Sequence, residues 1–270
     1  MTGWEALLLG LIQGLTEFIP VSSSGHLVLG QYLLGLDKEA ADVTFEVFVH
    51  FGTVLSILTV YWDDVAELVE EAWAGLRAPR AVPTRFAEND TFRLGVFILV
   101  TLVPTGVAYV LFREPLEQAF GSPRFTSAML VGTGVRLLLT RIGPRPDGDL
   151  SGVKAFVVGV AQSCALVPGI SRSGATICVA LYQNVAPERA ANFSFLMLLP
   201  VVLGGTVLKG LELMEQGVGA AGLSLGIGTV DAYGSGIGAI YVVLDVVRRG
   251  NLKYFAYYCL LIGGLGLWLL

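Results

Sequence analysis

The sequence predicts an all-α integral membrane protein, in which six transmembrane helices and two re-entrant helical hairpins form an inverted repeat. Three observations support this prediction. The chain is too apolar for a soluble domain, it has six long apolar stretches, and two further apolar stretches are broken by prolines, serines and glycines in nearly the same order. Duplicated, broken apolar segments are typical of membrane folds built from two pseudo-symmetric halves.

The composition indicates that the chain lies in a membrane. Of its 270 residues, 54% are hydrophobic and 14% are charged, and its mean hydropathy is +0.71. About 25% of the residues in soluble domains are charged. Apolar helices of about 20 residues cross a hydrocarbon core. The predicted crossings lie at residues 45–62, 92–112, 125–140, 190–211, 223–246 and 252–270.

One motif is present twice, at an offset of 149 residues. GLIQGLTEFIPVSSSGHL covers residues 10–27, and GVAQSCALVPGISRSGAT covers residues 159–176. The alignment pairs Gly10 with Gly159, Gln13 with Gln162, Ser22 with Ser171, Ser24 with Ser173 and Gly25 with Gly174, with the prolines displaced by one position. We interpret the motif as a duplicated functional loop whose two copies meet in the folded protein.

Each copy lies in a segment that is unsuited to a straight crossing. Segments 4–35 and 152–183 are apolar but contain polar residues beside Pro20 or Pro168. Two half-helices that meet at a protein-enclosed tip would keep those groups away from lipid. Each half then has one hairpin and three crossings, and this odd number inverts the second half. We expect a single membrane domain, 1–270, with repeats at about 1–142 and 150–270 and with the tips near the midplane.

The basic residues on the predicted loops indicate the orientation. Four lie on one side of the membrane: Lys38, Arg113, Arg124 and Lys209. Eleven lie on the other: Arg77, Arg80, Arg85, Arg93, Arg141, Arg145, Lys154, Arg189, Arg248, Arg249 and Lys253. The side with eleven is expected to be cytoplasmic. Both termini and the mouth of the first hairpin then face outward from the plasma membrane. The N-terminus has no basic leader, so we interpret it as mature sequence and not as a signal peptide.

The second tip has the chemistry of an anion site. It offers a run of hydroxyls, glycine and a guanidinium: Ser171, Arg172, Ser173, Gly174 and Thr176. Helix N-termini attract anions, and the planar donors of arginine match phosphate oxygens. An arginine at membrane depth is a functional candidate, although an internal ion pair that serves packing is the alternative. We therefore predict a phosphate-binding loop.

The first tip adds groups that the second lacks. Gln13 and Glu17 lie four residues apart, so their oxygens suit a divalent cation, Mg²⁺ or Ca²⁺, that also binds substrate phosphate. His26 is a candidate acid, base or nucleophile, with a structural role as the alternative. Ser23 could attack phosphorus if a neighbouring base accepted its proton. Further hydroxyls and a glycine complete this tip: Ser22, Ser24 and Gly25.

Other polar residues have less specific interpretations. Glu46 and His50 share a helix face, so they could line the same cavity or bond to each other. Arg136 and Asp231 could pair across helices. The acidic segment 63–91 is expected to be an amphipathic cytoplasmic extension. The three cysteines lack metal-site or disulfide spacing, and the scattered basic residues do not indicate nucleic-acid binding.

QGLTEFIPVSSSGHL and PGISRSGAT together resemble the two signature motifs of the undecaprenyl pyrophosphate phosphatases, the bacitracin-resistance phosphatase family. The resemblance covers the whole chain and includes the stretches FEVFVHFGT and NFSFLMLLP. It implies a membrane enzyme that removes the terminal phosphate of a polyprenyl diphosphate with a divalent cation. Such an enzyme recycles the lipid carrier for peptidoglycan and other surface glycans. The expected partners are this lipid substrate and membrane lipids, with a homodimer as a possible assembly and no nucleic acid.

Carried over by position, the resemblance implies catalytic roles for Glu17, Ser23, His26 and Arg172. Gln13 departs from an acidic pair, because a neutral amide replaces a carboxylate and leaves more of the metal coordination to Glu17. We expect the remaining tip residues to bind phosphate: Ser22, Ser24, Gly25, Ser171, Ser173, Gly174 and Thr176. Three mechanisms stay open: attack on the phosphorus by Ser23, by His26 or by water.

A polyprenyl-phosphate flippase or anion transporter is the competing hypothesis, because inverted repeats with broken hairpins are also a transporter architecture. Glu17, Ser23 and His26 lie in one hairpin only. A pure anion pathway has less need of these groups, so the asymmetry between the two tips favours the phosphatase.

Overall fold

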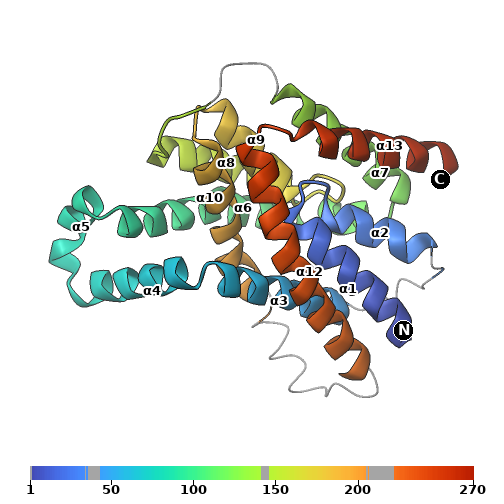
Figure 1. Ribbon diagram of the computed structural model, residues 1–270, viewed down its shortest axis with the longest axis horizontal. Helices are drawn as coiled ribbons and strands as arrows, with labels where there is room; N and C mark the ends of the chain where they lie inside the picture. The colour runs from blue at the N-terminus through green and yellow to red at the C-terminus, as the bar shows by residue number, and fades with distance from the viewer. Residues whose placement is uncertain (1, 34, 36–42, 141–145, 205, 207–221) are drawn as a thin grey trace.

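The protein, seen here as a computed structural model, is built from α-helices (Figure 1). The structure describes residues 2–33, 35, 43–140, 146–204, 206 and 222–270. Within those ranges, β-type pairing is limited to an isolated parallel bridge between Gly148 and Val185. The predicted all-α class is therefore confirmed for the described part of the chain.

The helices begin where the sequence offers capping side chains. Thr2, Asn89, Ser122, Ser151 and Ser171 each accept a hydrogen bond from a backbone N–H in the first turn of the helix that follows. The first half contains α1 (Gly3–Phe18), α2 (Ser23–Leu33), α3 (Val43–Val60), α4 (Trp62–Arg77), α5 (Val82–Glu88), α6 (Asp90–Phe120) and α7 (Pro123–Leu139). The second half contains α8 (Gly152–Cys164), α9 (Arg172–Tyr182), α10 (Pro187–Leu196), α12 (Gly222–Arg248) and α13 (Lys253–Leu269).

Two of the described helices, α6 and α12, are long and apolar enough to cross a membrane. A third crossing is possible if Thr44–Val60 and Trp62–Arg77 count as one span, although they meet at an angle of 91°. The chain thus has the helices of a membrane protein, while the six crossings stay a prediction. The predicted span 190–211 is interrupted at Met197, and its residues 205 and 207–211 lie outside the described ranges. Some basic residues used for orientation also lie outside them: Lys38, Arg141, Arg145 and Lys209.

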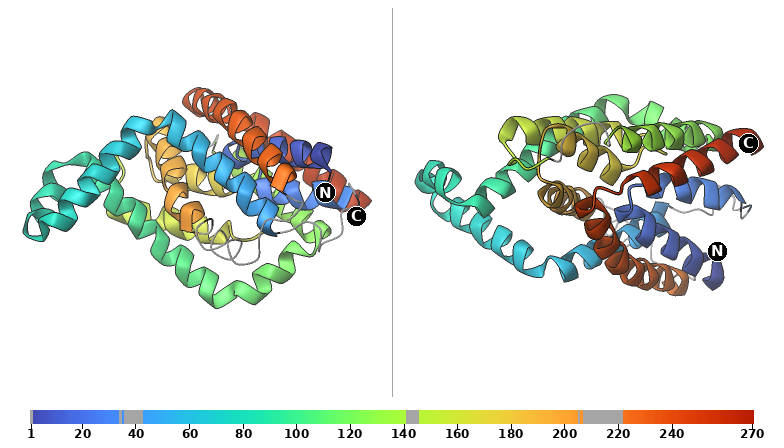
Figure 2. Two further views of the ribbon diagram at one scale, coloured as in Figure 1. Left: turned by 90° about the horizontal axis from the view of Figure 1, so that it is seen from below. Right: turned by 45° about the horizontal axis from the view of Figure 1, so that its top comes forward.

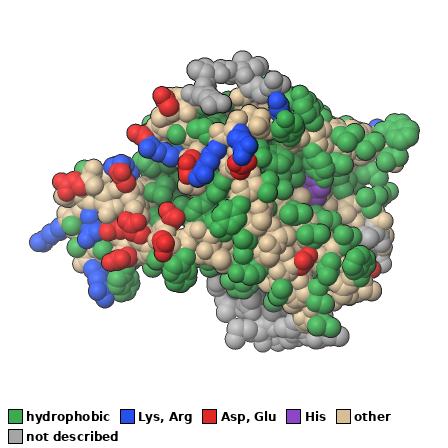
Figure 3. Space-filling view, in the orientation of Figure 1, with side chains coloured by type: hydrophobic (Ala, Val, Ile, Leu, Met, Phe, Trp, Pro, Cys, Tyr) green, Lys and Arg blue, Asp and Glu red, His purple; other side chains and the backbone are tan. Residues whose placement is uncertain are grey.

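Segment 63–91 is helical and belongs to an arm that projects from the main body (Figures 1 and 2). The arm consists of α4, α5 and the start of α6. Figure 3 shows charged side chains gathered on it. Arg85 donates to Glu71 at 2.5 Å, and Thr91 donates to Glu67 at 2.9 Å. These contacts hold the arm together through its acidic side chains.

Each of the two broken segments forms a helix pair joined by a short non-helical tip. In the first pair, α1 ends at Phe18 and α2 begins at Ser23, while Ser22 adopts a left-handed backbone with φ of 74°. In the second pair, α8 ends at Cys164 and α9 begins at Arg172. Both tips therefore contain the prolines and serines that the sequence motif predicted.

Each helix pair packs against a long helix from the other half of the chain. Helix α1 lies against α12, and α8 lies against α6. A Cβ atom on Gly10 would lie 2.5 Å from the Gly228 carbonyl oxygen, and one on Gly159 would lie 2.7 Å from Thr101 Cα. These paired glycines permit helix contacts that no larger side chain would allow. The packing brings the two tips together beside a core that contains Phe18 and Phe195.

Candidate active site

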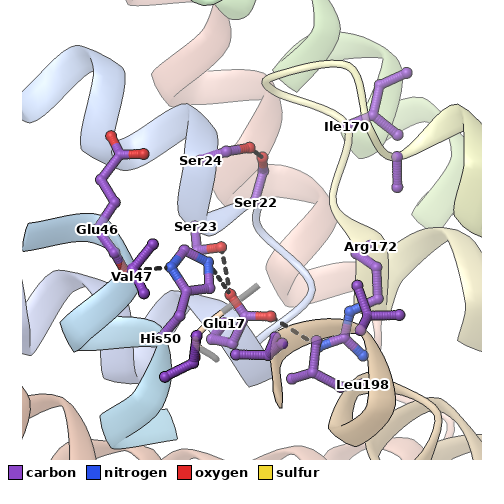
Figure 4. A pocket seen from close by; sticks show the side chains of 14 residues that line it. Glu17, Ser22, Ser23, Ser24, Glu46, Val47, His50, Ile170, Arg172 and Leu198 are labelled. Carbon is purple, nitrogen blue, oxygen red and sulfur yellow. Dashed lines mark hydrogen bonds and ion pairs between the residues drawn. The ribbon is translucent and has the colours of Figure 1, made fainter. Parts of the chain in front are cut away.

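A cavity of about 320 Å³ lies where the two tips meet. Residues from the first tip, from α3, from the second tip and from the helical stretch after α10 form its wall (Figure 4). Its polar side contains Glu17, Ser22, Ser23, Ser24, Glu46, His50 and Arg172. Its apolar side contains Val47, Ala165, Ile170, Leu198, Val201 and Val202. Such a cavity can hold a molecule with a charged end and a hydrocarbon end.

The carboxylate of Glu17 is the centre of the polar side. Its Oε2 atom accepts from Ser23 Oγ at 2.7 Å and from Gln13 Nε2 at 3.0 Å, and it lies 3.6 Å from His50 Nε2. Its Oε1 atom accepts from Arg172 Nη2 at 2.8 Å. Figure 4 shows Ser23 and His50 directed at Glu17 from one side and Arg172 from the other. A nearly buried carboxylate thus connects a hydroxyl of one tip to a guanidinium of the other.

Arg172 is held by groups from both halves of the chain. Besides its contact with Glu17, its Nη1 atom donates to the Ser194 carbonyl oxygen at 2.6 Å. Its Nε atom is buried and makes no hydrogen bond among the described residues. Arg172 is also the first residue of α9. A guanidinium and a helix N-terminus each favour an anion nearby.

The paired serines of the two tips make the same local hydrogen bonds. The hydroxyls of Ser22 and Ser24 lie 3.3 Å apart, and those of Ser171 and Ser173 lie 3.2 Å apart. Ser22 Oγ accepts from the Gly25 N–H at 3.2 Å, and Ser171 Oγ accepts from the Gly174 N–H at 3.1 Å. The alignment at 149 residues thus pairs positions that have the same conformational role.

The second tip does not offer all of its predicted phosphate ligands to the cavity. Ser171 and Ser173 are each 1% exposed, Thr176 is fully buried, and none of the three lines the cavity. Thr176 Oγ1 is 2.6 Å from Ser194 Oγ and donates to the Arg172 carbonyl oxygen. Because their hydroxyls bond internally, these residues shape the tip around Arg172. A contact between them and phosphate stays a prediction.

The ring nitrogens of His26 contact groups other than Glu17. Its Nδ1 atom lies 2.8 Å from the Ser22 carbonyl oxygen, and its Nε2 atom lies 2.9 Å from the Tyr258 hydroxyl. The imidazole and the Tyr258 ring are stacked, with centroids 5.5 Å apart. His26 does not line the cavity, whereas His50 does. His26 therefore contacts the left-handed backbone at Ser22. His50, and not His26, is the histidine next to the Glu17 carboxylate.

The remaining predicted site residues also differ in whether they line the cavity. Gln13 is fully buried and directs its amide nitrogen at Glu17, while its Oε1 atom makes no hydrogen bond within the described residues. Glu46 lines the cavity and accepts from Gln31 Nε2 at 3.4 Å. His50 contacts the Glu46 backbone carbonyl oxygen at 2.7 Å. Thus Glu46 and His50 share the cavity, and Gln13 supports Glu17 from behind it.

The predicted pair of Arg136 and Asp231 is wrong. Arg136 Nη2 lies 3.5 Å from both Thr133 Oγ1 and the Ser171 carbonyl oxygen. The Oδ2 atom of Asp231 is buried and makes no hydrogen bond within the described ranges. The physical reason is helix packing: α7 lies against α13, whereas α12 lies against α1 and α3. Arg136 therefore faces the second tip instead of α12.

Residues 6–265 match the family model described as bacitracin resistance protein BacA. The chain belongs to this family. It is 98% identical to an undecaprenyl-diphosphatase from Salinibacter ruber over 270 residues, which cover 100% of both chains. It is 38% identical to an undecaprenyl-diphosphatase from Halothermothrix orenii over 264 residues, covering 96% of this chain and 95% of the relative. The Bacteroides fragilis undecaprenyl-diphosphatase is 38% identical over 269 residues, covering 97% and 96%.

Membership in the BacA family agrees with the resemblance seen in the two motifs, but the motifs do not contain every residue of the site. Ser194 contacts both Arg172 and Thr176. In the sequence it is part of the stretch NFSFLMLLP, which carries the family resemblance. Tyr258 contacts His26 from α13, and Thr133 contacts the second tip from α7. Neither residue has a distinctive sequence signal, because tyrosine and threonine are ordinary residues of membrane helices.

Proposed function

We propose that this chain is an integral-membrane phosphatase that hydrolyses undecaprenyl diphosphate to undecaprenyl phosphate and inorganic phosphate, and so recycles the lipid carrier for cell-wall or surface glycan synthesis. The observation that carries the proposal is the Glu17 carboxylate, which accepts from Ser23 at 2.7 Å and from Arg172 at 2.8 Å. A nucleophile, a base and an anion clamp thus lie together. Membership in the BacA family and the names of the relatives support the same activity.

The geometry favours Ser23 among the three candidate nucleophiles. Ser23 Oγ donates to Glu17, so Glu17 can take the proton as the oxygen bonds to the terminal phosphorus. The bond from this phosphorus to the bridging oxygen breaks, and Glu17 passes the proton to the departing undecaprenyl phosphate. Glu17 then takes a proton from water, whose oxygen bonds to the phosphorus. That proton moves to Ser23 Oγ as the phosphoserine bond breaks, which releases phosphate and restores the enzyme.

Arg172 has the role of stabilising negative charge on the transferred phosphoryl group. Its guanidinium lines the cavity, and the N-terminus of α9 begins at the same residue, so both can stabilise an anion there. The apolar wall that includes Leu198 and Val202 suits the start of a prenyl chain. The rest of that chain would extend into the surrounding lipid, which explains the location of the site within the membrane.

A divalent cation, Mg²⁺ or Ca²⁺, is also part of the proposal. Glu17 and Glu46 supply carboxylate oxygens on the cavity wall, and the tip serines supply hydroxyls. These hard donors suit either cation. The described residues contain no group of three or more His, Cys, Asp or Glu side chains that could hold a metal. Substrate phosphate oxygens would therefore complete the coordination, and the cation would neutralise part of the diphosphate charge.

The finer topology belongs to the same proposal. We infer that the two helix pairs are re-entrant hairpins within six crossings, and that the halves form an inverted repeat. The reciprocal packing of α1 on α12 and of α8 on α6 supports this inference. The termini and the mouth of the first hairpin face outward. One-sided labelling of cysteines introduced near the termini, in sealed vesicles, tests this orientation. The homodimer stays a prediction.

Phosphate release from undecaprenyl diphosphate in detergent tests the activity. We expect the wild type to release phosphate, EDTA to stop this release, and added Mg²⁺ or Ca²⁺ to restore it. Ser23→Ala and Glu17→Gln should each lower the rate of release by at least about 1000-fold, because a nucleophile or its base is removed. Ser163→Ala is a matched control, because the Ser163 hydroxyl bonds the Gly159 carbonyl of its own helix. No release from the wild type across several prenyl lengths and metals would refute the proposal, and lipid flux in proteoliposomes would then test transport.

A further inference from the structure

The second tip depends on contacts with α7. Gly169 has a left-handed backbone with φ of 89°, and a Cβ atom at this position would lie 2.3 Å from the Thr126 carbonyl oxygen. The turn therefore lies directly on the surface of α7. Between Cys164 and Arg172 the chain has left one helix and not begun the next, so some buried backbone groups need partners from elsewhere.

The hydroxyl of Thr133 serves two of those backbone groups. It donates to the Gly169 carbonyl oxygen at 2.9 Å and accepts from the Ser171 N–H at 3.1 Å. Thr133 is fully buried, and Ser171 is 1% exposed, so water does not replace these bonds readily. One side chain thus fixes the backbone on both sides of Ile170, which itself lines the cavity.

Arg136 provides a second contact from the next turn of α7. Its Nη2 atom lies 3.5 Å from the Ser171 carbonyl oxygen and 3.5 Å from Thr133 Oγ1. The N–H and the C=O of Ser171 are therefore both approached by α7 side chains. Ser171 is the N-cap of α9, and Arg172 is the next residue. The position of Arg172 depends on where α7 holds Ser171.

The guanidinium of Arg172 must be placed accurately, because it makes two contacts at once. It must reach Glu17 at 2.8 Å and the Ser194 carbonyl oxygen at 2.6 Å at the same time. A displacement of about 1 Å at a catalytic group can reduce a rate by about 100-fold. Thr133 does not line the cavity, so its influence on the reaction would pass through the tip.

We propose that Thr133 is a positioning residue for the reaction: its hydroxyl fixes the backbone at Gly169 and Ser171 and thereby aims Arg172 at the phosphate and at Glu17. This inference rests on the proposed phosphatase function for its kinetic consequence. Its structural part, the hold of α7 on the second tip, is independent of the substrate.

The test compares three variants that change a buried threonine. Thr133→Val removes the hydroxyl at nearly constant volume, and Thr133→Ser keeps it. Thr126→Val is the matched control, because Thr126 is fully buried on the same helix and its Oγ1 makes no hydrogen bond within the described residues. We expect Thr133→Val to lower kcat/KM by about 10- to 100-fold, with most of the loss in kcat. Thr133→Ser and Thr126→Val should stay within about threefold of the wild type.

Amide hydrogen exchange provides a readout without turnover. Thr133→Val should lose protection at the Ser171 amide, whereas Thr133→Ser and Thr126→Val should keep it. Normal protection in Thr133→Val, or equal kinetic losses in Thr133→Val and Thr126→Val, would overturn the inference. If Thr133→Val does not fold, Thr133→Ala replaces it in both measurements. If the wild type releases no phosphate, the proposed function fails, while the exchange data still decide whether Thr133 holds the tip.

Discussion

Removing Arg172 should leave a buried negative charge without its partner. The guanidinium and the Glu17 carboxylate are 2.8 Å apart, and 13% and 6% of their side chains are exposed. Breaking a buried pair by deleting one partner costs about 3–5 kcal/mol. Ser23 and Gln13 still donate to Glu17, so the lower end of that range applies. We expect Arg172→Ala to reduce the free energy of unfolding by about 3 kcal/mol and nearly to abolish phosphate release.

A second arginine and glutamate pair provides the control. Arg113 and Glu117 are 2.7 Å apart, but 64% and 62% of their side chains are exposed. Exposed pairs contribute about 0–1 kcal/mol, so Arg113→Ala should have little effect. The double variant Arg172→Ala with Glu17→Gln removes the unpaired charge as well. It should recover most of the lost stability while remaining inactive.

Thermal unfolding in detergent measures these differences. For a chain of this size, about 3 kcal/mol corresponds to a decrease in Tm of about 6–12 °C. Equal decreases for Arg172→Ala and Arg113→Ala would refute the reasoning from burial. Failure of Glu17→Gln to restore stability in the double variant would show that the loss comes from something other than an unpaired carboxylate. Full phosphate release by Arg172→Ala would refute its role as the anion clamp.

Two further predictions concern helix packing and the first tip. Gly10→Ala should lower Tm, because its Cβ atom would meet the Gly228 carbonyl oxygen at 2.5 Å and overpacking costs about 1–3 kcal/mol. Gly226→Ala, whose Cβ would have no neighbour within 4 Å, is the control, and a similar decrease in both would contradict the packing argument. Tyr258→Phe should reduce phosphate release by less than about tenfold, because it removes one hydrogen bond to His26. His26→Ala should lose more, since it also loses the contact with the Ser22 carbonyl, and equal losses would contradict this role.

The features that the sequence could predict are those determined by residues close together in the chain. Pro20 has no backbone N–H and clashes with the preceding turn of a helix, so a break near it follows from residue type alone. The same reasoning applies before Arg172. Ser22 and Ser171 make matching hydrogen bonds because the same short pattern imposes the same turn in both copies. The contact between Glu17 and Arg172 agrees with the expectation that the two tips meet.

The parts that the sequence could not predict depend on distant partners. The catalytic role of His26 stays a prediction, whereas the stacking of its imidazole on Tyr258 from α13 is a feature that the sequence did not predict. Nothing near His26 in the sequence indicates this contact. Thr133 is one of many apolar-helix threonines, and its two bonds to the second tip depend on how α7 lies against the turn. The bend of 91° after α3 likewise occurs without a proline or glycine between the two helices.

The reciprocal packing of the helix pairs has a consequence for the order in which the protein is made. Helix α1 is synthesised first, but its packing partner α12 is among the last segments to leave the ribosome. Until then, Gly10 and Gly14 lack the helix that packs closely against them. Ser23 and Glu17 have no Arg172 beside them until residue 172 of 270 has been made. The proposed catalytic groups thus come together only after the second tip has been made. An incomplete chain would contain the nucleophile but not the site.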